Sequence, residues 1–164
     1  MPRIIKMDLS VSSIDNAINE IKAFRDSLEV KKYRLLEELT KIGLREASVR
    51  FASAMYDGVN DSHVSAELTH FGYRIVAAGK AVAFIEFGAG VYHNTGDPYP
   101  DPRPDGIVGI GEYGKGYGKR PAWGFRDESG ELVITRGNPA AMPMWYASEE
   151  MRSKIQKIAQ EVFG

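Results

Sequence analysis

The fold is decided by one stretch of the sequence, Ala81-Val82-Ala83-Phe84-Ile85-Glu86-Phe87-Gly88-Ala89-Gly90. Its first seven residues are apolar except for Glu86, and a glycine then ends the run. Short apolar runs bounded by turn residues are typical of strands. Two similar runs precede it at residues 64–69 and 73–77, with tight connections at Gly72 and at residues 78–80. We therefore predict an antiparallel meander of three strands.

Helical spacing of apolar residues flanks this meander on both sides. Before it, the spacing predicts helices over residues 14–28, 35–42 and 44–56, with Gly43 as a stop or hinge. After it, residues 144–163 carry one apolar stripe at helical spacing. The predicted fold class is α+β, with N-terminal helices, an antiparallel β-meander with a long inserted loop, and a C-terminal helix packed on the sheet.

The remaining segments complete a single predicted domain of residues 1–164. Alternating apolar residues predict a short opening strand at residues 5–9 and a last strand at residues 131–135. Between the meander and the last strand, residues 88–130 hold most of the glycines and five of the eight prolines. A loop of this length is uncommon in a compact domain unless it is functional, and its aromatic residues argue against disorder. We expect residues 88–130 to form an assembly loop that becomes ordered against a partner.

Composition argues against several classes of function. Lysine and arginine (21) nearly balance aspartate and glutamate (22), whereas a domain that wraps nucleic acid usually has a basic excess. The chain has no cysteine, so disulfides, thiolate zinc sites and cysteine nucleophiles are excluded. No apolar span of 18 residues and no signal peptide is present, which predicts a protein made and kept in an aqueous compartment.

Two phosphate-binding motifs are matched in letters only. Residues 109–114 satisfy G-x-G-x-x-G, and residues 109–115 nearly spell a Walker A loop. Both motifs need a helix to begin at their end, and Gly116, Gly118 and Pro121 prevent one. Gly116 also occupies the place of the magnesium-binding serine or threonine. We therefore expect no nucleotide cofactor.

No catalytic or metal-binding set is indicated by the sequence. The three histidines are spread along the chain, and no pair lies on one helical face. The aspartates of the loop alternate with prolines, which keep the chain extended and the carboxylates apart. A metal-dependent enzyme that uses Glu86, His93 and the loop aspartates is the less favoured alternative.

Glu86 is the charge most in need of an explanation. On a strand it would share one face with Val82 and Phe84, and a buried carboxylate requires partners. We expect a bond from a local backbone N–H, or from a lysine or arginine. Glu86 is interpreted as a structural anchor and not as a catalytic acid, because the sequence does not indicate a second carboxylate or histidine beside it.

The long loop is divided by charge. Acidic residues dominate its first half and basic residues its second half: Asp97, Asp101, Asp105 and Glu112, then Lys115, Lys119, Arg120 and Arg126. Such a division suits a head-to-tail contact between identical subunits. A solvated loop with scattered charges is one alternative, and nucleic-acid contact by the basic half with Tyr117 and Trp123 is another.

Residues 84–90 resemble the strand-ending (V/I)-E-F-G-T signature of the neck and tail-completion family of tailed bacteriophages. In that family an N-terminal helix precedes the signature, and a variable loop, a proline and a C-terminal helix follow. Residues 137–147 resemble the last part of this pattern, and residues 109–116 with 123–125 resemble a Gly/Tyr-rich insertion of one subgroup. Ala89 departs from the pattern, since the family often has threonine there.

The resemblance implies a structural virion protein, not an enzyme, that forms a homo-oligomeric ring of six subunits at the head–tail neck or tail end. Such a ring completes the tail and joins it to the head; a tail terminator or other minor tail protein is the alternative. The implied partners are further copies of the chain, neighbouring neck and tail proteins, and DNA passing non-specifically through the ring, with no cofactor and no membrane. The expected location is the virion, after assembly in the cytoplasm of the bacterial host. The candidates for the subunit interface are Glu86, Gly88, Gly90, Asp97, Asp101, Asp105, Tyr113, Lys115, Tyr117, Lys119, Arg120 and Trp123.

Overall fold

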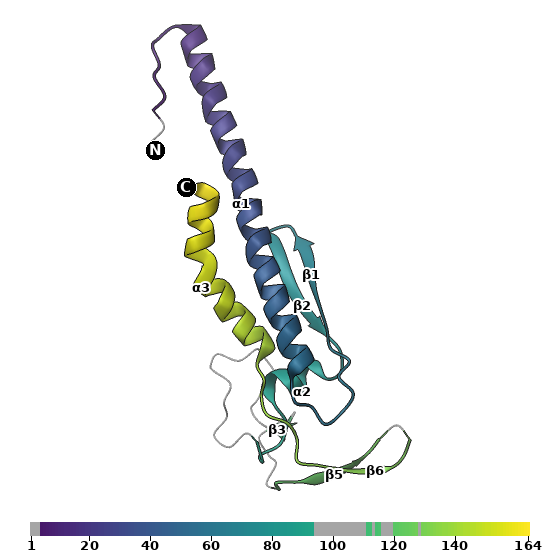
Figure 1. Ribbon diagram of the computed structural model, residues 1–164. Coiled ribbons are helices and arrows are strands. Elements are labelled where there is room, and N and C mark those ends of the chain that lie inside the picture. Colours follow the sequence, from purple (N-terminus) through teal and green to yellow (C-terminus); the bar gives the residue numbers. More distant parts are fainter. Residues whose placement is uncertain (1–3, 94–110, 113, 116–119, 128) are drawn as a thin grey trace.

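The protein has an α+β fold, as predicted (Figure 1). The computed structural model describes residues 4–93, 111–112, 114–115, 120–127 and 129–164. In chain order the elements are α1 (Val11–Ser53), β1 (His63–Thr69), β2 (Gly72–Ala78), α2 (Val82–Phe87), β3 (Gly111–Glu112), β4 (Gly114–Lys115), β5 (Trp123–Arg126), β6 (Leu132–Thr135) and α3 (Pro143–Phe163). None of the helices in these ranges is both long enough and apolar enough to cross a membrane.

The helix α1 is a single element of 43 residues, about 65 Å long at 1.5 Å per residue. Ser10 caps it, because the Ser10 hydroxyl accepts a hydrogen bond from the Ser13 N–H at 3.3 Å. The predicted break at Gly43 is wrong. A Cβ at Gly43 would lie 2.5 Å from the sulfur of Met151 and 2.6 Å from Cδ1 of Ile75. This glycine therefore permits close packing and does not end the helix. The predicted strand at residues 5–9 is also wrong, since those residues lie outside any strand.

The strands β1 and β2 form an antiparallel hairpin, as predicted from the first two apolar runs. Val64 pairs with Ala77, and Glu67 pairs with Arg74, whose guanidinium also forms an ion pair with Glu67 at 2.7 Å. The hairpin lies along the C-terminal half of α1 (Figure 1).

The third predicted strand is wrong, because residues 82–87 form the short helix α2. Asp61 holds the turn before this helix: the Asp61 carboxylate accepts hydrogen bonds from the backbone N–H groups of Lys80 and Ala81, both at 2.9 Å. Ala81 and Ile85, four residues apart, then lie on one helical face and are fully buried against Phe51 of α1. A six-residue apolar run can satisfy a strand or a helix, and here tertiary packing decides.

The helix α3 runs antiparallel to α1. Arg50 of α1 stacks on Tyr146 near the start of α3, and Lys31 of α1 lies over the ring of Phe163 at the end of α3. At Gly43, Met151 of α3 and Ile75 of β2 come together, so α3 also meets the sheet there. The first half of α1 projects beyond the end of α3 (Figure 1).

The strands β5 and β6 form a second antiparallel hairpin at the opposite end of the molecule from the N-terminus (Figure 1). The strand expected at residues 131–135 is thereby confirmed, as Leu132–Thr135. The expectation that residues 88–130 form one uninterrupted loop is wrong, since β3, β4 and β5 lie within them. In β5, Trp123 and Phe125 alternate with Gly124 and Arg126, so the period of a strand was present in the sequence.

Candidate functional site

The carboxylate of Glu86 caps the N-terminus of α3. Glu86 is only 3% exposed. Its Oε2 accepts a hydrogen bond from the Met144 N–H at 2.8 Å, and its Oε1 accepts one from the Trp145 N–H at 3.1 Å. These are two of the N–H groups that the first turn of a helix leaves without an internal partner. Met142, at the cap position, has φ 50° and supplies no side-chain acceptor, so Glu86 supplies it from α2.

Backbone hydrogen bonds join α2 to the segment before α3. The carbonyl of Ile85 accepts from the Ala141 N–H at 2.9 Å, and the carbonyl of Glu86 accepts from the Met142 N–H at 3.3 Å. The side-chain amide of Asn138 donates to the carbonyl of Phe84 at 2.8 Å. Three carbonyl groups near the end of α2 are thus satisfied by one segment of chain, which fixes where α3 begins.

The chain leaving α2 is also held by residues 137–138. Ala89 and Asn138 exchange two backbone hydrogen bonds, at 3.0 and 3.1 Å. Gly137 has φ 78°, and a Cβ there would lie 1.9 Å from the carbonyl oxygen of Ala89. A Cβ at Gly90 would lie 2.5 Å from the indole of Trp123. Only glycine allows both approaches. We call residues 84–90 together with 137–145 the α2–α3 junction.

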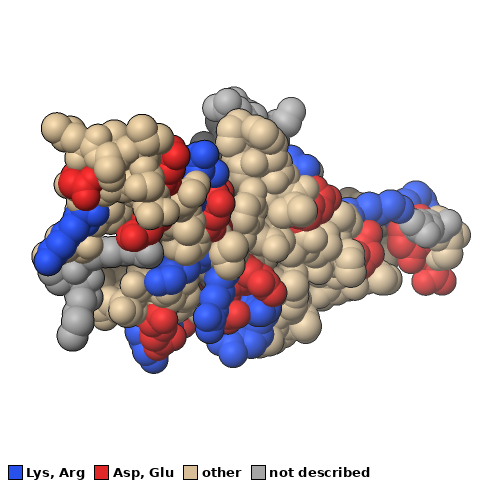
Figure 2. Space-filling model, turned by 90° about the horizontal axis from the view of Figure 1, so that it is seen from above, with Lys and Arg blue, Asp and Glu red and all other residues tan. Residues whose placement is uncertain are grey.

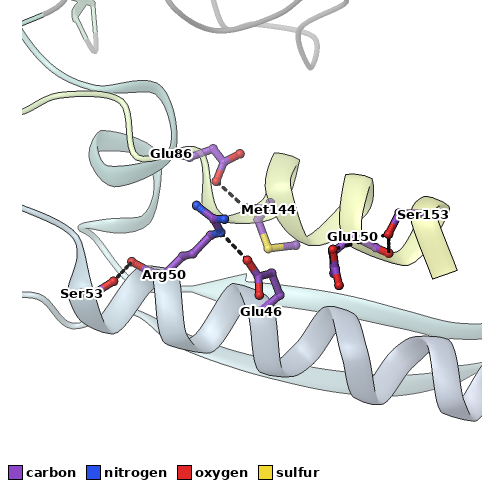
Figure 3. A network of polar contacts seen from close by, with 7 residues as sticks. All are labelled: Glu46, Arg50, Ser53, Glu86, Met144, Glu150 and Ser153. Carbon is purple, nitrogen blue, oxygen red and sulfur yellow. Dashed lines mark hydrogen bonds and ion pairs between the residues drawn. The ribbon is translucent and has the colours of Figure 1, made fainter.

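Arg50 reaches the same region from α1 (Figure 3). Its Nε donates to Glu46 Oε1 at 2.6 Å, and its Cζ lies 4.0 Å from the centre of the Tyr146 ring. In Figure 3 the guanidinium points from α1 toward the start of α3, where the Glu86 carboxylate lies. Arg50 was not among the residues predicted from the sequence. Its spacing of four residues from Glu46 was visible, but the sequence gives no sign that this pair faces α3.

A cavity of about 340 Å³ lies beside the junction. Aromatic side chains from three parts of the chain line it: Tyr56, Phe84, Trp123 and Phe125. At its edge the hydroxyl of Thr135 donates to Asp57 Oδ2 at 2.8 Å and accepts from the Gly137 N–H at 2.9 Å. The β5–β6 hairpin is thereby attached to the junction through Trp123 and Thr135.

Some of the interface candidates come together and others do not. Glu86, Gly88 and Gly90 are buried in the α2–α3 junction, and Trp123 packs on Gly90. Arg120 is exposed, before β5, and Lys115 ends β4. The remaining candidates, Asp97, Asp101, Asp105, Tyr113, Tyr117 and Lys119, lie outside the described residues. A role for these residues between subunits stays a prediction.

The acidic and histidine side chains form no metal site in the part of the chain that the structure describes. No group of three or more of them there is placed to hold an ion. On the face seen in Figure 2, Lys and Arg alternate with Asp and Glu, and uncharged surface separates them. Interspersed charges of both signs can give a protein partner complementary contacts.

Asp61 makes the start of α2 sensitive to pH. Hydrogen bonds from the backbone N–H groups of Ala81 and Lys80 hold the pKa of the Asp61 carboxyl below its ordinary value of 3.8. A lowered folded-state pKa stabilises the fold above the unfolded value, and this stabilisation is lost as pH falls through the folded value. Asp61→Asn should therefore lower Tm at pH 7, and the gap to the wild type should close below about pH 4.

Thermal unfolding measured at pH 7 and below about pH 4 gives this difference in Tm between Asp61→Asn and the wild type. The matched control is Asp26→Asn, which removes an exposed carboxylate that pairs with the neighbouring Arg25. Its Tm should stay near that of the wild type at both pH values. A gap for Asp61→Asn that stays constant down to pH 2 would contradict the role of the ionised carboxylate.

The chain matches no protein-family model, no curated protein and no solved structure.

Proposed function

We propose that this chain is a structural virion protein of a tailed bacteriophage. In this proposal, copies of the chain form a ring at the head–tail neck or the tail end, complete the tail and join it to the head. The described residues would act by holding neighbouring proteins and not by chemistry. The proposal extends the resemblance of residues 84–90 to the neck and tail-completion family.

The observation that carries the proposal is the exposure of apolar residues at both ends of an elongated molecule. In the first half of α1, every residue from Ile18 to Val30 is exposed, including Ile21 (57%) and Phe24 (44%). At the other end, Leu132 (64%) and Ile134 (67%) lie on one face of the β5–β6 hairpin. Contiguous exposed apolar residues mark sites of protein–protein contact. A subunit with such a surface at each end suits a ring that binds neighbours above and below.

The α2–α3 junction supports the proposal through its rigidity. A closed ring needs the same angle between contact surfaces in every subunit. Glu86 ties α2 to α3 through two hydrogen bonds, and Asn138 ties the chain before α3 to Phe84 and Ala89. These bonds fix the β5–β6 hairpin, attached through Gly137 and Trp123, relative to the helices. The signature run would thus set the geometry of the subunit.

Loss of the chain from a phage that encodes it tests the proposal. We expect DNA-filled heads and tails to accumulate unjoined in electron micrographs, with few infectious particles. The wild-type chain supplied in trans should restore joined particles, and mass spectrometry should detect it in them. Joined, infectious particles in normal number without the chain would overturn the proposal.

A variant of the β5–β6 hairpin tests whether its exposed apolar face is required. Leu132→Asp with Ile134→Asp places two charges on the exposed face of β6 and should fail to restore joined particles. The matched control is Val49→Asp with Val59→Asp, which changes two exposed valines outside the first half of α1 and outside β6. The control should restore particles as the wild type does, and circular dichroism should show that both variants are folded.

A further inference from the structure

We infer that the cavity beside the α2–α3 junction binds an arginine side chain of a partner protein. Four aromatic residues and one carboxylate line it: Tyr56, Phe84, Trp123, Phe125 and Asp57. Its volume of about 340 Å³ lies within the range of small-ligand pockets, roughly 300–1,000 Å³. The cavity is on the other face of the β5–β6 hairpin from Leu132 and Ile134, so it is a site beyond the contacts of the proposed function.

The aromatic side chains reach the cavity from three parts of the chain. Tyr56 follows α1 and Phe84 lies in α2, and their rings stack with centres 6.3 Å apart. Trp123 and Phe125 are two residues apart in β5, so both project from one face of the hairpin. The face of an aromatic ring carries partial negative charge and attracts a cation. Several rings around one cavity can therefore hold a cationic side chain.

Asp57 adds a full negative charge to the same cavity. The hydroxyl of Thr135 donates to Asp57 Oδ2 at 2.8 Å and accepts from the Gly137 N–H at 2.9 Å, which holds the carboxylate in place. No lysine or arginine among the described residues forms an ion pair with Asp57. A carboxylate beside aromatic rings is complementary to a cation and repels an anion.

The basic side chains that flank β5 and β6 have other partners. The guanidinium of Arg126, at the end of β5, donates to the carbonyl of Gly130 at 2.7 Å. Arg136, directly after β6, has its guanidinium 4.8 Å from the centre of the Tyr92 ring. Neither of them supplies a cation to the cavity, which leaves this place to a partner.

A wider groove continues from the cavity and suits a segment of polypeptide chain. It has a volume of about 1110 Å³ and shares four residues with the cavity: Tyr56, Asp57, Gly58 and Phe125. An extended segment of a partner can lie in this groove while one of its side chains enters the cavity. Arginine suits the cavity best among cationic side chains, because its planar guanidinium is weakly hydrated, stacks on aromatic rings and pairs with carboxylates. The chain itself stacks Arg50 on Tyr146 in this way.

A titration followed by nuclear magnetic resonance tests the site. The probe is the acetylated and amidated peptide glycyl-arginyl-glycine, and its match contains citrulline, which has the shape of arginine but no charge. The chain has two tryptophans, so the indole N–H signal of Trp123 reports on the cavity and that of Trp145, which does not line it, is the internal control. We expect the arginine peptide to shift the Trp123 signal to saturation, and the citrulline peptide to bind at least about tenfold more weakly.

Two variants and two matched controls locate the binding. Asp57→Asn keeps an acceptor for the Thr135 hydroxyl but removes the charge, and Phe125→Ala removes one aromatic wall. Each should weaken binding of the arginine peptide about fivefold. Asp26→Asn and Phe71→Ala change an exposed carboxylate and an exposed aromatic ring elsewhere, so they should bind as the wild type does. Circular dichroism checks that all four variants are folded.

Equal binding of the arginine and citrulline peptides would overturn the inference, because the cavity would then not recognise charge. A Trp123 signal that does not move with the arginine peptide would overturn it as well. So would an equal loss of binding in Asp57→Asn and Asp26→Asn, which would reflect only the net charge of the protein. The titration uses the purified chain without phage particles, so its failure would leave the proposed function standing. Binding by a chain that is absent from particles would do the reverse.

Discussion

Glu86→Ala is expected to lower the free energy of unfolding by about 3 kcal/mol, because it removes two charge-assisted hydrogen bonds to the start of α3. The Met144 and Trp145 N–H groups would lose their acceptors in a partly buried place. The favourable interaction of the carboxylate with the helix dipole is lost as well. In a protein of this size the change corresponds to a fall in Tm of roughly 6–12 °C. Chemical denaturation monitored by circular dichroism measures it.

Two variants separate capping from other causes. Glu86→Gln keeps the size of the side chain and one acceptor oxygen but loses the charge, so it should fall between the wild type and Glu86→Ala. The matched control is Glu149→Ala, in the same helix that Glu86 caps. Glu149 forms an exposed ion pair with Arg152 at 2.7 Å, and its loss should cost less than about 1 kcal/mol. If Glu86→Ala and Glu149→Ala prove equally stable, Glu86 does not anchor α3.

The parts of the fold that the sequence predicts are those with long or strict periodicity. The spacing from Ile14 to Leu28 and the stripe of residues 144–163 extend over several helical turns, so a helix is the only element that fits them. The runs at 64–69 and 73–77 lie either side of a tight turn, and their pairing is local. In each case the information needed is contained in neighbouring residues.

The secondary-structure predictions were wrong where contacts with residues far along the chain determine the local structure. The run at residues 82–87 is too short to show a period, and the turn before its helix is held by Asp61, some 20 residues earlier. Gly43 has the sequence signature of a helix stop, but the glycine is required by Met151, which comes from α3. Neither contact can be found before the elements are placed in space.

The sequence predicted that Glu86 needs hydrogen-bond partners, but it did not predict which residues provide them. A buried carboxylate in an apolar run requires a partner, and the expectation that Glu86 accepts a hydrogen bond from a backbone N–H is confirmed. The donors were expected to be local and instead lie 58 and 59 residues further along the chain. Asn138 was missed for the same reason, since its bond to Phe84 spans 54 residues. The sequence shows that a group needs a partner, but only packing selects it.

Gly137→Ala is expected to cost about 3 kcal/mol or more, through a direct collision with the backbone. Its φ of 78° is unfavourable for a residue with a side chain, and the new Cβ would lie 1.9 Å from the carbonyl oxygen of Ala89. That carbonyl accepts the hydrogen bond from the Asn138 N–H at 3.1 Å. The alanine side chain can be accommodated only if residues 88–90 and 137–138 separate. Both bonds between Ala89 and Asn138 are then lost.

Gly130→Ala is the control that shows the effect of backbone strain alone, without a collision. Gly130 has a similar φ of 88°, but a Cβ there meets nothing within 4 Å. It should therefore cost only about 1–2 kcal/mol, the ordinary penalty of a left-handed conformation for a residue with a side chain. Hydrogen exchange gives a second readout, because the Ala89 and Asn138 amides should lose protection in Gly137→Ala and keep it in Gly130→Ala. Equal stability of the two variants would mean that the close approach of Gly137 to Ala89 does not hold the junction. The larger loss for Gly137→Ala would show that the glycine is required by its neighbour and not by its own turn.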